Sequence, residues 1–421
     1  MLTNRFQSVN IFKFPSLIID KLKLWSLVAL AFFPLVDFLL RKIPFVGSIV
    51  GSVWDELIVV ALATLAFGRF LMGARFEQLP YHQMLKAFIL LGIAYLAVSL
   101  NSFGVDSEGF RAIYWYTFLA FILPYHVDRD LAAKLIRYVL YAGLIIGLHG
   151  VYQYVTKAPM PPGWVDAGET VRTRVYSVFG SPNIMGTYMI IIFPIAAGMA
   201  WASRTNRERL FFGFVALVTL ASLVFTNTRG AQLALFVALV ITSLLFDRRL
   251  FILVIVAGVA AMFVPQIQSR FLQLFDPLYW MKAAKDGRIY RWLTAYDVMR
   301  YNPFFGAGMG HFGGAVADRH FGTKYVDSYY FKTMAEMGLV GLLAMLALFG
   351  TIVRDLYRRI FKPLRARQDW PLLLGLFTSI LAVLVQNAVE NVFEVPAMNF
   401  LFWFIVTLTV ILSGKKEETA E

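Results

Sequence analysis

The chain has 421 residues, of which 59% are hydrophobic and only 15% are charged, whereas soluble globular domains contain about 45–50% apolar and about 25% charged residues. This composition excludes an ordinary soluble protein, and it also excludes a disordered chain, which would be poor in hydrophobic residues. The sequence has no cysteine, so disulfides, thiolate metal sites and a cysteine nucleophile are excluded. Its five histidines lack the spacing of metal ligands. We therefore expect an all-α polytopic membrane protein with neither a metal site nor a cofactor.

Twelve segments of the chain are candidates for membrane-spanning helices, each of which needs about 20 mostly apolar residues. The first is preceded by Lys21 and Lys23 and lacks a small-residue cleavage site, which indicates a retained helix rather than a signal peptide. We expect residues 1–421 to form a single integral membrane domain. The candidate spans lie near residues 24–40, 53–73, 85–101, 110–125, 131–154, 183–202, 209–226, 230–246, 249–265, 327–353, 370–391 and 396–413.

Lysine and arginine are divided unevenly between the segments that join these spans. One set of short segments holds 23 of them, whereas the short segments on the opposite side hold four, namely Arg41, Lys42, Arg111 and Arg229. The positive-inside rule then predicts that both termini are cytoplasmic. The net charge of +13 follows from this membrane topology, so we do not expect a nucleic-acid partner.

Two longer segments fall on the outer side, at residues 155–182 and 266–326, and loops of this length are commonly functional. The second is predicted to be a large structured loop with amphipathic helices. One such helix runs from Asp286, a candidate N-cap, to Tyr301, and Asn302-Pro303 ends it. A glycine-rich turn, Gly306 to Gly310, follows.

Basic residues on the outer side are the main functional signal, because topology alone would place them inside. Guanidinium groups bind phosphate oxygens in pairs and stay charged, so the set suits a diphosphate attached to a lipid. The alternative is that these residues bind lipid headgroups or pair with Asp276, Asp286 and Asp297. The set comprises Arg172, Arg174, Arg229, Lys282, Lys285, Arg288 and Arg291.

Two short connections position candidate residues at the outer rim. Thr226 to Gly230 joins two apolar segments, and we expect Gly230 to allow a tight turn that holds Arg229 in place. Alternatively, Arg229 only anchors this hairpin at the interface. After Gly180-Ser-Pro182, Asn183 is a candidate N-cap of the next helix.

Asp327 and Glu336 are the acidic candidates in the tenth span. Asp327 stands at its start, where an aspartate is most often a helix cap, and helical spacing puts Tyr330 on its side. Glu336 lies deeper on the opposite side, where an ionisable group is functional or paired, and Lys332 is its expected partner. Five other acids lie near span ends, where solvation or helix contacts explain them: Asp37, Asp55, Glu56, Glu390 and Glu394.

Four motifs in order resemble a known family. Arg174 to Asn183 is similar to its R…F-G-N-P-N segment, and Thr228-Arg-Gly-Ala-Gln-Leu-Ala-Leu235 to its S/T-R-G-A-x-L-A-L turn. Residues 287–292 and 302–312 resemble its G-R…W…P-x-x-G-x-G-x-G-x-F loop, and residues 327–343 its H-N-x-Y-L…E-x-G-L-x-G-L-L helix. This family is the bacterial O-antigen ligase and O-antigen or exopolysaccharide polymerase superfamily (WaaL and Wzy proteins).

The resemblance implies a membrane glycosyltransferase of the GT-C type at the outer face of the bacterial plasma membrane. It would act on glycans linked to undecaprenyl diphosphate, without a nucleotide sugar or metal, and the arginines that carry over are Arg174, Arg229 and Arg288. One departure is that Asp327 and Ser328 stand where ligases have His-Asn. This favours a chain-extending polymerase, with His311 and His320 as off-register alternatives for the missing histidine.

The resulting hypothesis is transfer of one lipid-diphosphate glycan to the sugar hydroxyl of another. Asp327 is the candidate general base or orienting group, and the three arginines stabilise the departing diphosphate. Membrane lipids and a chain-length regulator are the other expected partners. Rival hypotheses are a ligase to a lipid or protein acceptor and, from another class, a lipid-linked glycan flippase, whose charges would line a membrane-crossing cavity. The substrate-binding set is Arg172, Arg174, Arg291, Trp292, Tyr330 and Glu336.

Overall fold

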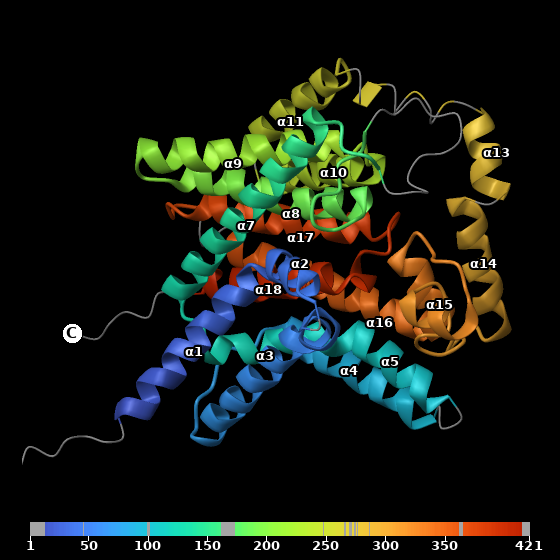
Figure 1. Ribbon diagram of the computed structural model, residues 1–421, viewed down its shortest axis with the longest axis horizontal. Helices are drawn as coiled ribbons and strands as arrows, with labels where there is room; N and C mark the ends of the chain where they lie inside the picture. Colours follow the sequence, from blue (N-terminus) through green and yellow to red (C-terminus); the bar gives the residue numbers. More distant parts are fainter. Residues whose placement is uncertain are drawn as a thin grey trace, which may run out of the picture.

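The computed structural model describes residues 13–414 except for residues 45, 99–101, 161–172, 247, 265–266, 269–271, 273–274, 276, 286 and 362–364, and every regular element in this part is helical. The long central helices run side by side in Figure 1. The loop helices α13 (Pro277–Lys285), α14 (Arg288–Tyr301) and α15 (Ala315–Phe321) gather at one end of them.

Seven of the described helices are long and apolar enough to cross a membrane. This confirms an all-α polytopic membrane protein, while the count of twelve spans stays a prediction. α3 (Val46–Leu71), α11 (Arg248–Ala261) and α17 (Trp370–Gln386) are further apolar helices at predicted spans. The seven are α4 (Pro80–Val98), α7 (Arg129–Val155), α8 (Pro182–Ala202), α9 (Asn206–Phe225), α10 (Arg229–Phe246), α16 (Tyr329–Ile360) and α18 (Pro396–Ser413).

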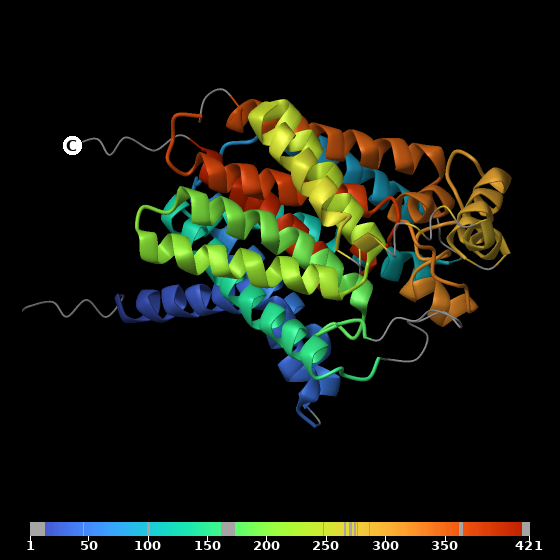
Figure 2. The same ribbon diagram turned by 90° about the horizontal axis from the view of Figure 1, so that it is seen from above.

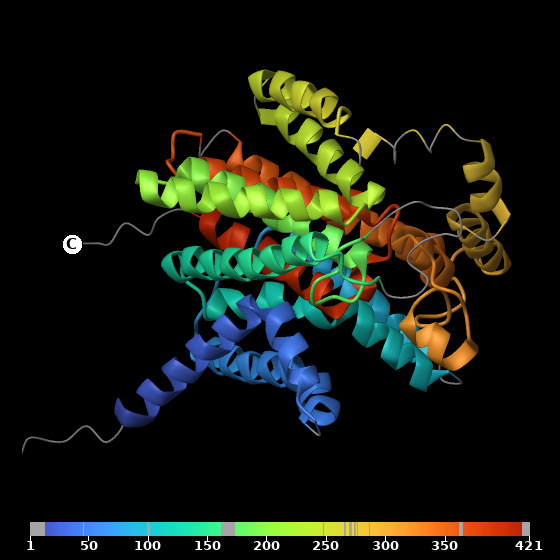
Figure 3. The same ribbon diagram turned by 45° about the horizontal axis from the view of Figure 1, so that its top comes forward.

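The core lies around α8, α17 and α18, whose side chains are mostly buried. α8 and α17 approach each other closely because small residues stand at the contact. A Cβ atom on Gly375 would lie only 2.2 Å from the carbonyl oxygen of Pro194, and one on Gly198 only 2.4 Å from that of Pro371. α10 and α11 cross the central helices obliquely, as Figures 2 and 3 show.

Two predicted spans differ from the straight helices expected. The span near 24–40 is a bent pair, α1 (Lys13–Ala31) and α2 (Phe33–Lys42), with an angle of 89° at the break. Pro34 stands in the first turn of α2 and has no N–H to continue the helix. The span near 110–125 changes between α-helical and 3₁₀ turns as α5 (Phe103–Tyr114), η1 (Trp115–Phe118), α6 (Leu119–Ile122) and η2 (Leu123–Tyr125).

A helix is present at the predicted place in the loop: α14 runs from Arg288 to Tyr301, and Asn302 is its C-cap. Its amphipathic character stays a prediction. Its N-cap is Gly287 without a side-chain hydrogen bond, and the expected cap Asp286 lies outside the described residues. The glycine-rich segment after α14 folds as a series of turns, with positive φ at Gly306, Gly308 and Gly310.

α16 is interrupted at Gly338, and the loop after α14 closes the gap. Gly338 has φ 62° and ψ −164°, a conformation essentially restricted to glycine. On one side of the break, the amide groups of Leu339 and Val340 donate to the carbonyl oxygens of Pro303 and Phe304, at 2.8 and 3.2 Å. The backbone groups that a broken membrane helix would leave unpaired are thereby satisfied.

The same loop pairs with the other side of the break. The amide groups of Ala307 and Gly308 donate to the carbonyl oxygens of Ala335 and Glu336, each at 2.9 Å. The large loop is therefore joined to the membrane helices by backbone hydrogen bonds.

A buried ionic network continues this connection. Lys332 Nζ lies 2.7 Å from Glu336 Oε2 and 3.4 Å from Glu394 Oε2, and all three side chains are almost fully buried. Glu336 Oε1 accepts hydrogen bonds from the amides of Gly310 and Phe312, and Glu394 Oε1 accepts one from Ala315. The expected pairing of Lys332 with Glu336 is confirmed, and the carboxylates fix the loop backbone from residue 310 to 315.

We predict that Gly338→Ala destabilises the protein by at least about 2 kcal/mol, because the glycine-only conformation and the backbone contact both oppose a side chain. The added Cβ would lie 2.4 Å from the carbonyl carbon of Phe304. Unfolding in detergent, followed by tryptophan fluorescence, measures the change. Gly350→Ala is the matched control in the same helix, because a Cβ there meets nothing within 4 Å; equal losses in both variants would contradict the prediction.

Lys332→Met is expected to cost about 3–5 kcal/mol, because it leaves two buried carboxylates without their cation. Adding Glu336→Gln removes one of these charges and restores part of the loss. The free energy of unfolding of the wild type, the single variant and the double variant tests this. A double variant no more stable than Lys332→Met would show that charge is not the cause.

Candidate active site

Asp327 lies directly before α16 but does not cap it. Ser328 is the N-cap, and its hydroxyl accepts a hydrogen bond from the amide of Phe331 at 3.3 Å. The carboxylate of Asp327 is thus left for other partners. Its Oδ2 lies 2.9 Å from Arg291 Nη1 and 3.7 Å from Arg288 Nε. The expectation of a cap at Asp327 is therefore wrong, and the residue pairs with the arginines of α14.

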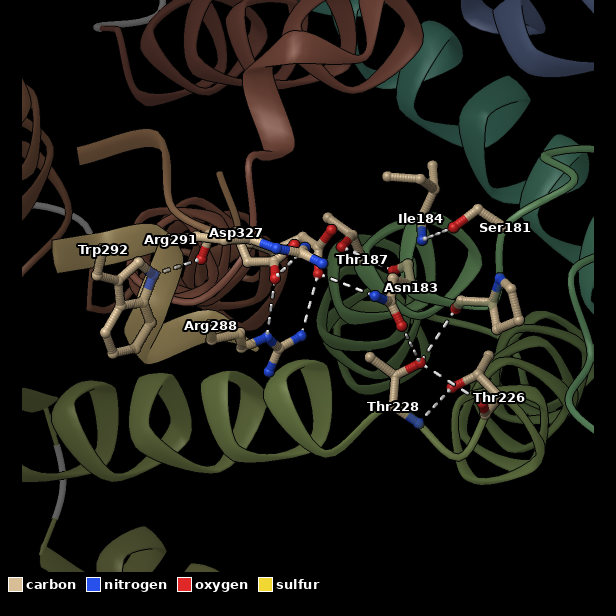
Figure 4. Close-up of polar contacts among 12 residues, drawn as sticks. Ser181, Asn183, Ile184, Thr187, Thr226, Thr228, Arg288, Arg291, Trp292 and Asp327 are labelled. Carbon is tan, nitrogen blue, oxygen red and sulfur yellow. Dashed lines mark hydrogen bonds and ion pairs between the residues drawn. The ribbon is translucent and has the colours of Figure 1, made fainter. Parts of the chain in front are cut away.

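Arg288 stands between two carboxylates that come from different parts of the chain. Its Nη2 lies 3.5 Å from Glu390 Oε2, while its Nε faces Asp327. Figure 4 shows the Arg288 side chain reaching from α14 toward Asp327. Glu390 belongs to the connection between α17 and α18, so Arg288 joins the outer loop to two membrane helices.

Glu390 is joined in turn to the start of α8. Asn183 Nδ2 donates to Glu390 Oε2 at 3.0 Å, and Asn183 Oδ1 accepts from Arg174 Nη2 at 2.9 Å. Arg174 Nε also donates to the carbonyl oxygen of Thr226 at 3.0 Å. Asn183 was expected to cap α8, but Ser181 is the cap, which leaves the Asn183 amide to connect Glu390 with Arg174.

Hydrogen bonds and ion pairs join these side chains into one continuous polar cluster. Figure 4 labels four of its members, Asn183, Arg288, Arg291 and Asp327. We call it the outer polar cluster, because the positive-inside rule predicts that it lies on the outer side of the membrane. Its residues come from the segment before α8, the start of α8, α14, the start of α16 and the connection after α17. Asn183 and Glu390, which are in direct contact, lie 207 positions apart in the sequence. Its members are Arg174, Asn183, Arg288, Arg291, Asp327 and Glu390.

Arg229 is the first residue of α10. The residue before it, Thr228, contacts the cluster, because its hydroxyl oxygen accepts a hydrogen bond from Arg174 Nη2. Thr228 Oγ1 donates to the carbonyl oxygen of Pro182 at 3.1 Å, which ties the α9–α10 hairpin to the start of α8. The tight turn depends on Asn227, with φ 52°, and not on Gly230 as expected. Gly230 instead packs against α17, since a Cβ there would lie 3.4 Å from Gln386 Oε1.

Glu390 is the functional candidate that the sequence did not single out. Burial raises its pKa to about 7, against the opposing effect of the Arg288 guanidinium. A carboxyl group with a pKa near neutrality can accept and release protons at physiological pH. In the sequence, Glu390 is one of several acidic residues near span ends. The one feature that distinguishes it there is the group of amide residues around it, Gln386, Asn387 and Asn391.

Two buried amide side chains next to Glu390 make no hydrogen bond within the described part of the chain. They belong to Gln386 and Asn387, which are 1% and 0% exposed. The backbone of Asn387 is engaged, because its carbonyl oxygen accepts from the amide of Tyr329 at 2.9 Å. Amide groups supply both donors and acceptors, so this pair can bind hydroxyl groups or water.

The two aromatic candidates are held by the protein. Trp292 Nε1 donates to the carbonyl oxygen of Asp327 at 3.2 Å, and its ring stacks on Phe331 with centroids 5.4 Å apart. Tyr330 donates its hydroxyl to the carbonyl oxygen of Leu384 at 2.7 Å. Stacking of either ring against a sugar stays a prediction, and both rings brace the start of α16.

The remaining candidates are not in the cluster. Glu336 belongs to the Lys332 network, and Arg172, Asp276 and Asp286 lie outside the described residues. Asp297 pairs with Arg300 at 3.4 Å. His311 lies 3.3 Å from Asp106, and His320 lies 3.3 Å from Glu108. Both histidines therefore face α5 rather than Asp327, which argues against either as the replacement base.

The charged groups of the cluster are guanidinium groups paired with carboxylates. Among the described residues, no group of three or more histidine, aspartate or glutamate side chains could hold a metal ion. The guanidinium groups of Arg174, Arg288 and Arg291 and the amide of Asn183 supply hydrogen-bond donors for an anion. Glu390 supplies an acceptor with a pKa near 7.

Comparison with known proteins identifies one region. Residues 212–346 match the model of a family described as O-antigen ligase (Wzy_C). This segment contains Arg229, Arg288, Arg291, Trp292 and Asp327. No curated protein matches the chain. The match supports the resemblance noted in the sequence: residues 212–346, about a third of the chain, are similar to the O-antigen ligase family.

Proposed function

We propose that the protein is a glycosyltransferase that polymerises oligosaccharide units linked to undecaprenyl diphosphate at the outer face of the bacterial plasma membrane. The observation that carries this proposal is Arg288 between Asp327 and Glu390, at 3.7 and 3.5 Å. A guanidinium and two carboxylates at a membrane interface suit a reaction that needs an anion stabilised and a proton removed. The superfamily supports lipid-linked glycans as substrates.

The arginines of the site would bind the diphosphate of the donor. Arg288 and Arg291 are about one-third exposed, so their guanidinium groups are held by carboxylates yet reachable from outside. Arg174 is fixed by Thr226 and Asn183, and Arg229 begins α10 beside Thr228. Fixed cations stabilise charge as it develops on a leaving group, since they need no rearrangement in the transition state.

The two carboxylates would have different roles in the reaction. Asp327 is held by both arginines of α14 and would position them and the acceptor hydroxyl. Glu390, with a pKa raised to about 7 by burial, is better suited to accept the proton. This assignment moves the general base from Asp327, the candidate in the sequence, to Glu390.

The reaction is a single displacement at the anomeric carbon of the donor. The acceptor hydroxyl oxygen forms the new glycosidic bond while its proton passes to Glu390. The bond from the anomeric carbon to the diphosphate oxygen breaks, and its electron pair leaves with undecaprenyl diphosphate. Arg174, Arg229 and Arg288 stabilise the charge on that group. The replacement of the ligase histidine by Asp327 favours a second lipid-linked glycan as acceptor, and a ligase reaction differs only in that acceptor.

Glu390→Gln is expected to lower kcat about 100-fold or more, because general-base catalysis contributes on that order. In the wild type the rate should fall as the pH drops below about 7, where the Glu390 carboxyl becomes protonated, and the variant should lose this limb. Initial rates across pH measure both effects. Glu108→Gln is the control, since Glu108 is also paired with an arginine, Arg319, at 3.2 Å. An unchanged acidic limb in Glu390→Gln would exclude Glu390 as the base.

The product distinguishes the proposed polymerase from its rivals. Purified protein in nanodiscs, given undecaprenyl-diphosphate repeat units and EDTA but no nucleotide sugar, should form a ladder of lipid-linked oligomers. Arg288→Ala should lose at least about 100-fold in rate, because it removes a preorganised charge from the leaving group. Transfer only onto an added lipid or protein acceptor would identify a ligase. Movement of the lipid across vesicle bilayers without a glycan product would identify a flippase.

A further inference from the structure

A large cavity lies at the opposite ends of the helices that carry the outer polar cluster. α8 begins next to Asn183 and ends at Ala202, which lines the cavity, and α16 runs from the Asp327 end to the cavity residues Arg358 and Arg359. α8 has 21 residues, which corresponds to about 32 Å, the thickness of a bilayer core. The cavity therefore opens at the other membrane face, the face that the positive-inside rule assigns to the cytoplasm.

The cavity is large and arginine-rich. Its volume is about 1680 Å³, above the range of about 300–1,000 Å³ that is usual for pockets of small ligands. Six arginines line it, against three carboxylates from Glu77, Glu208 and Asp369. The arginines are Arg129, Arg137, Arg204, Arg358, Arg359 and Arg367.

The three carboxylates do not neutralise this set. Asp369 is shared, because Oδ2 lies 2.6 Å from Arg129 Nη2 and 2.5 Å from Arg367 Nη2. Glu208 pairs with Arg137 at 2.9 Å. Arg204 donates to the uncharged amide oxygen of Gln368 at 2.6 Å. A net positive charge thus remains within a partly enclosed space, which attracts anions.

Arg359 provides a specific sign of a ligand. Its Nη2 donates to Glu77 at 2.8 Å, but its Nη1 is buried and has no hydrogen-bond partner within the described residues. A buried guanidinium nitrogen without an acceptor is costly. Arg358, the neighbouring residue, also lines the cavity and is exposed. A phosphate oxygen is the acceptor that such a pair of guanidinium groups binds best.

Apolar side chains line the same cavity beside the arginines. They belong to Leu79, Ala133, Met199 and Leu372, and these residues come from membrane-spanning helices or their ends. We propose that the cavity binds an anionic glycerophospholipid, with its phosphate on the arginines and the start of its acyl chains against the apolar residues. Basic pockets between membrane helices commonly bind such headgroups, whereas a free phosphate ester would leave the apolar part unused. This site goes beyond the transferase reaction and does not depend on it.

Native mass spectrometry of the full-length protein in detergent tests the proposal, with phosphatidylglycerol, cardiolipin and phosphatidylethanolamine as probes. The anionic lipids should bind in preference to phosphatidylethanolamine. Arg204→Gln with Arg358→Gln should weaken their binding about 30-fold, because each arginine near an anionic lipid contributes roughly fivefold. Neither residue has a carboxylate partner among the described residues, so this variant leaves no buried carboxylate unpaired. Lys134→Gln with Arg207→Gln is the matched control, which removes two exposed charges from α7 and α9 outside the cavity lining.

Three outcomes would overturn the proposal. The first is equal binding of phosphatidylethanolamine and the anionic lipids. The second is an equal loss of binding in the cavity variant and in the control variant, which would indicate general surface charge. The third is binding of inorganic phosphate that depends on Arg204 and Arg358 while neither anionic lipid binds, which would assign the cavity to a soluble phosphate ester.

Discussion

The break in α16 at Gly338 is the constraint on which the arrangement of the large loop and the start of α16 depends. A helix inside a membrane cannot leave its amide and carbonyl groups without partners. Here the partners come from the backbone of residues 303–308, so the loop that follows α14 must lie against the membrane helices. The Lys332, Glu336 and Glu394 network then holds the next stretch, residues 310–315. The loop is thereby held to α16 and to the connection between α17 and α18.

Fixing that loop brings α14 to the start of α16. Arg288 and Arg291 lie one turn apart on α14, and Asp327 meets both of them. Glu390 approaches from the other side, held by Asn183. In the outer polar cluster every charged group has a fixed neighbour of opposite sign or an amide, which is the preorganisation that a leaving diphosphate requires. Glu390, whose pKa burial raises to about 7, is the base in the proposed reaction.

The two ends of the helix bundle differ in how they hold their arginines. At the end that carries α14, two carboxylates and an amide contact three guanidinium groups. At the other end, six arginines and three carboxylates line a cavity of about 1680 Å³. The positive charge at this end agrees with its predicted cytoplasmic orientation. Because the arginines surround a cavity that apolar side chains also line, we propose a lipid site there. Figure 1 shows α13, α14 and α15 together at one end of the helix bundle.

The sequence by itself determined the class of protein, the helical architecture and the resemblance of residues 212–346 to the O-antigen ligase family. A run of about 20 apolar residues predicts a membrane-spanning helix without any knowledge of the fold. The motifs at Arg229, Arg288 and Asp327 consist of residues close together in the sequence, so they can be recognised from the sequence alone. Tertiary structure alone decided the rest. The bend at Pro34, the break at Gly338 and the role of Ser328 as cap depend on which backbone groups find partners across the fold. Glu390 joined the site because α17 ends against Arg288 and Asn183, and contacts between residues so far apart leave no periodic trace in the sequence.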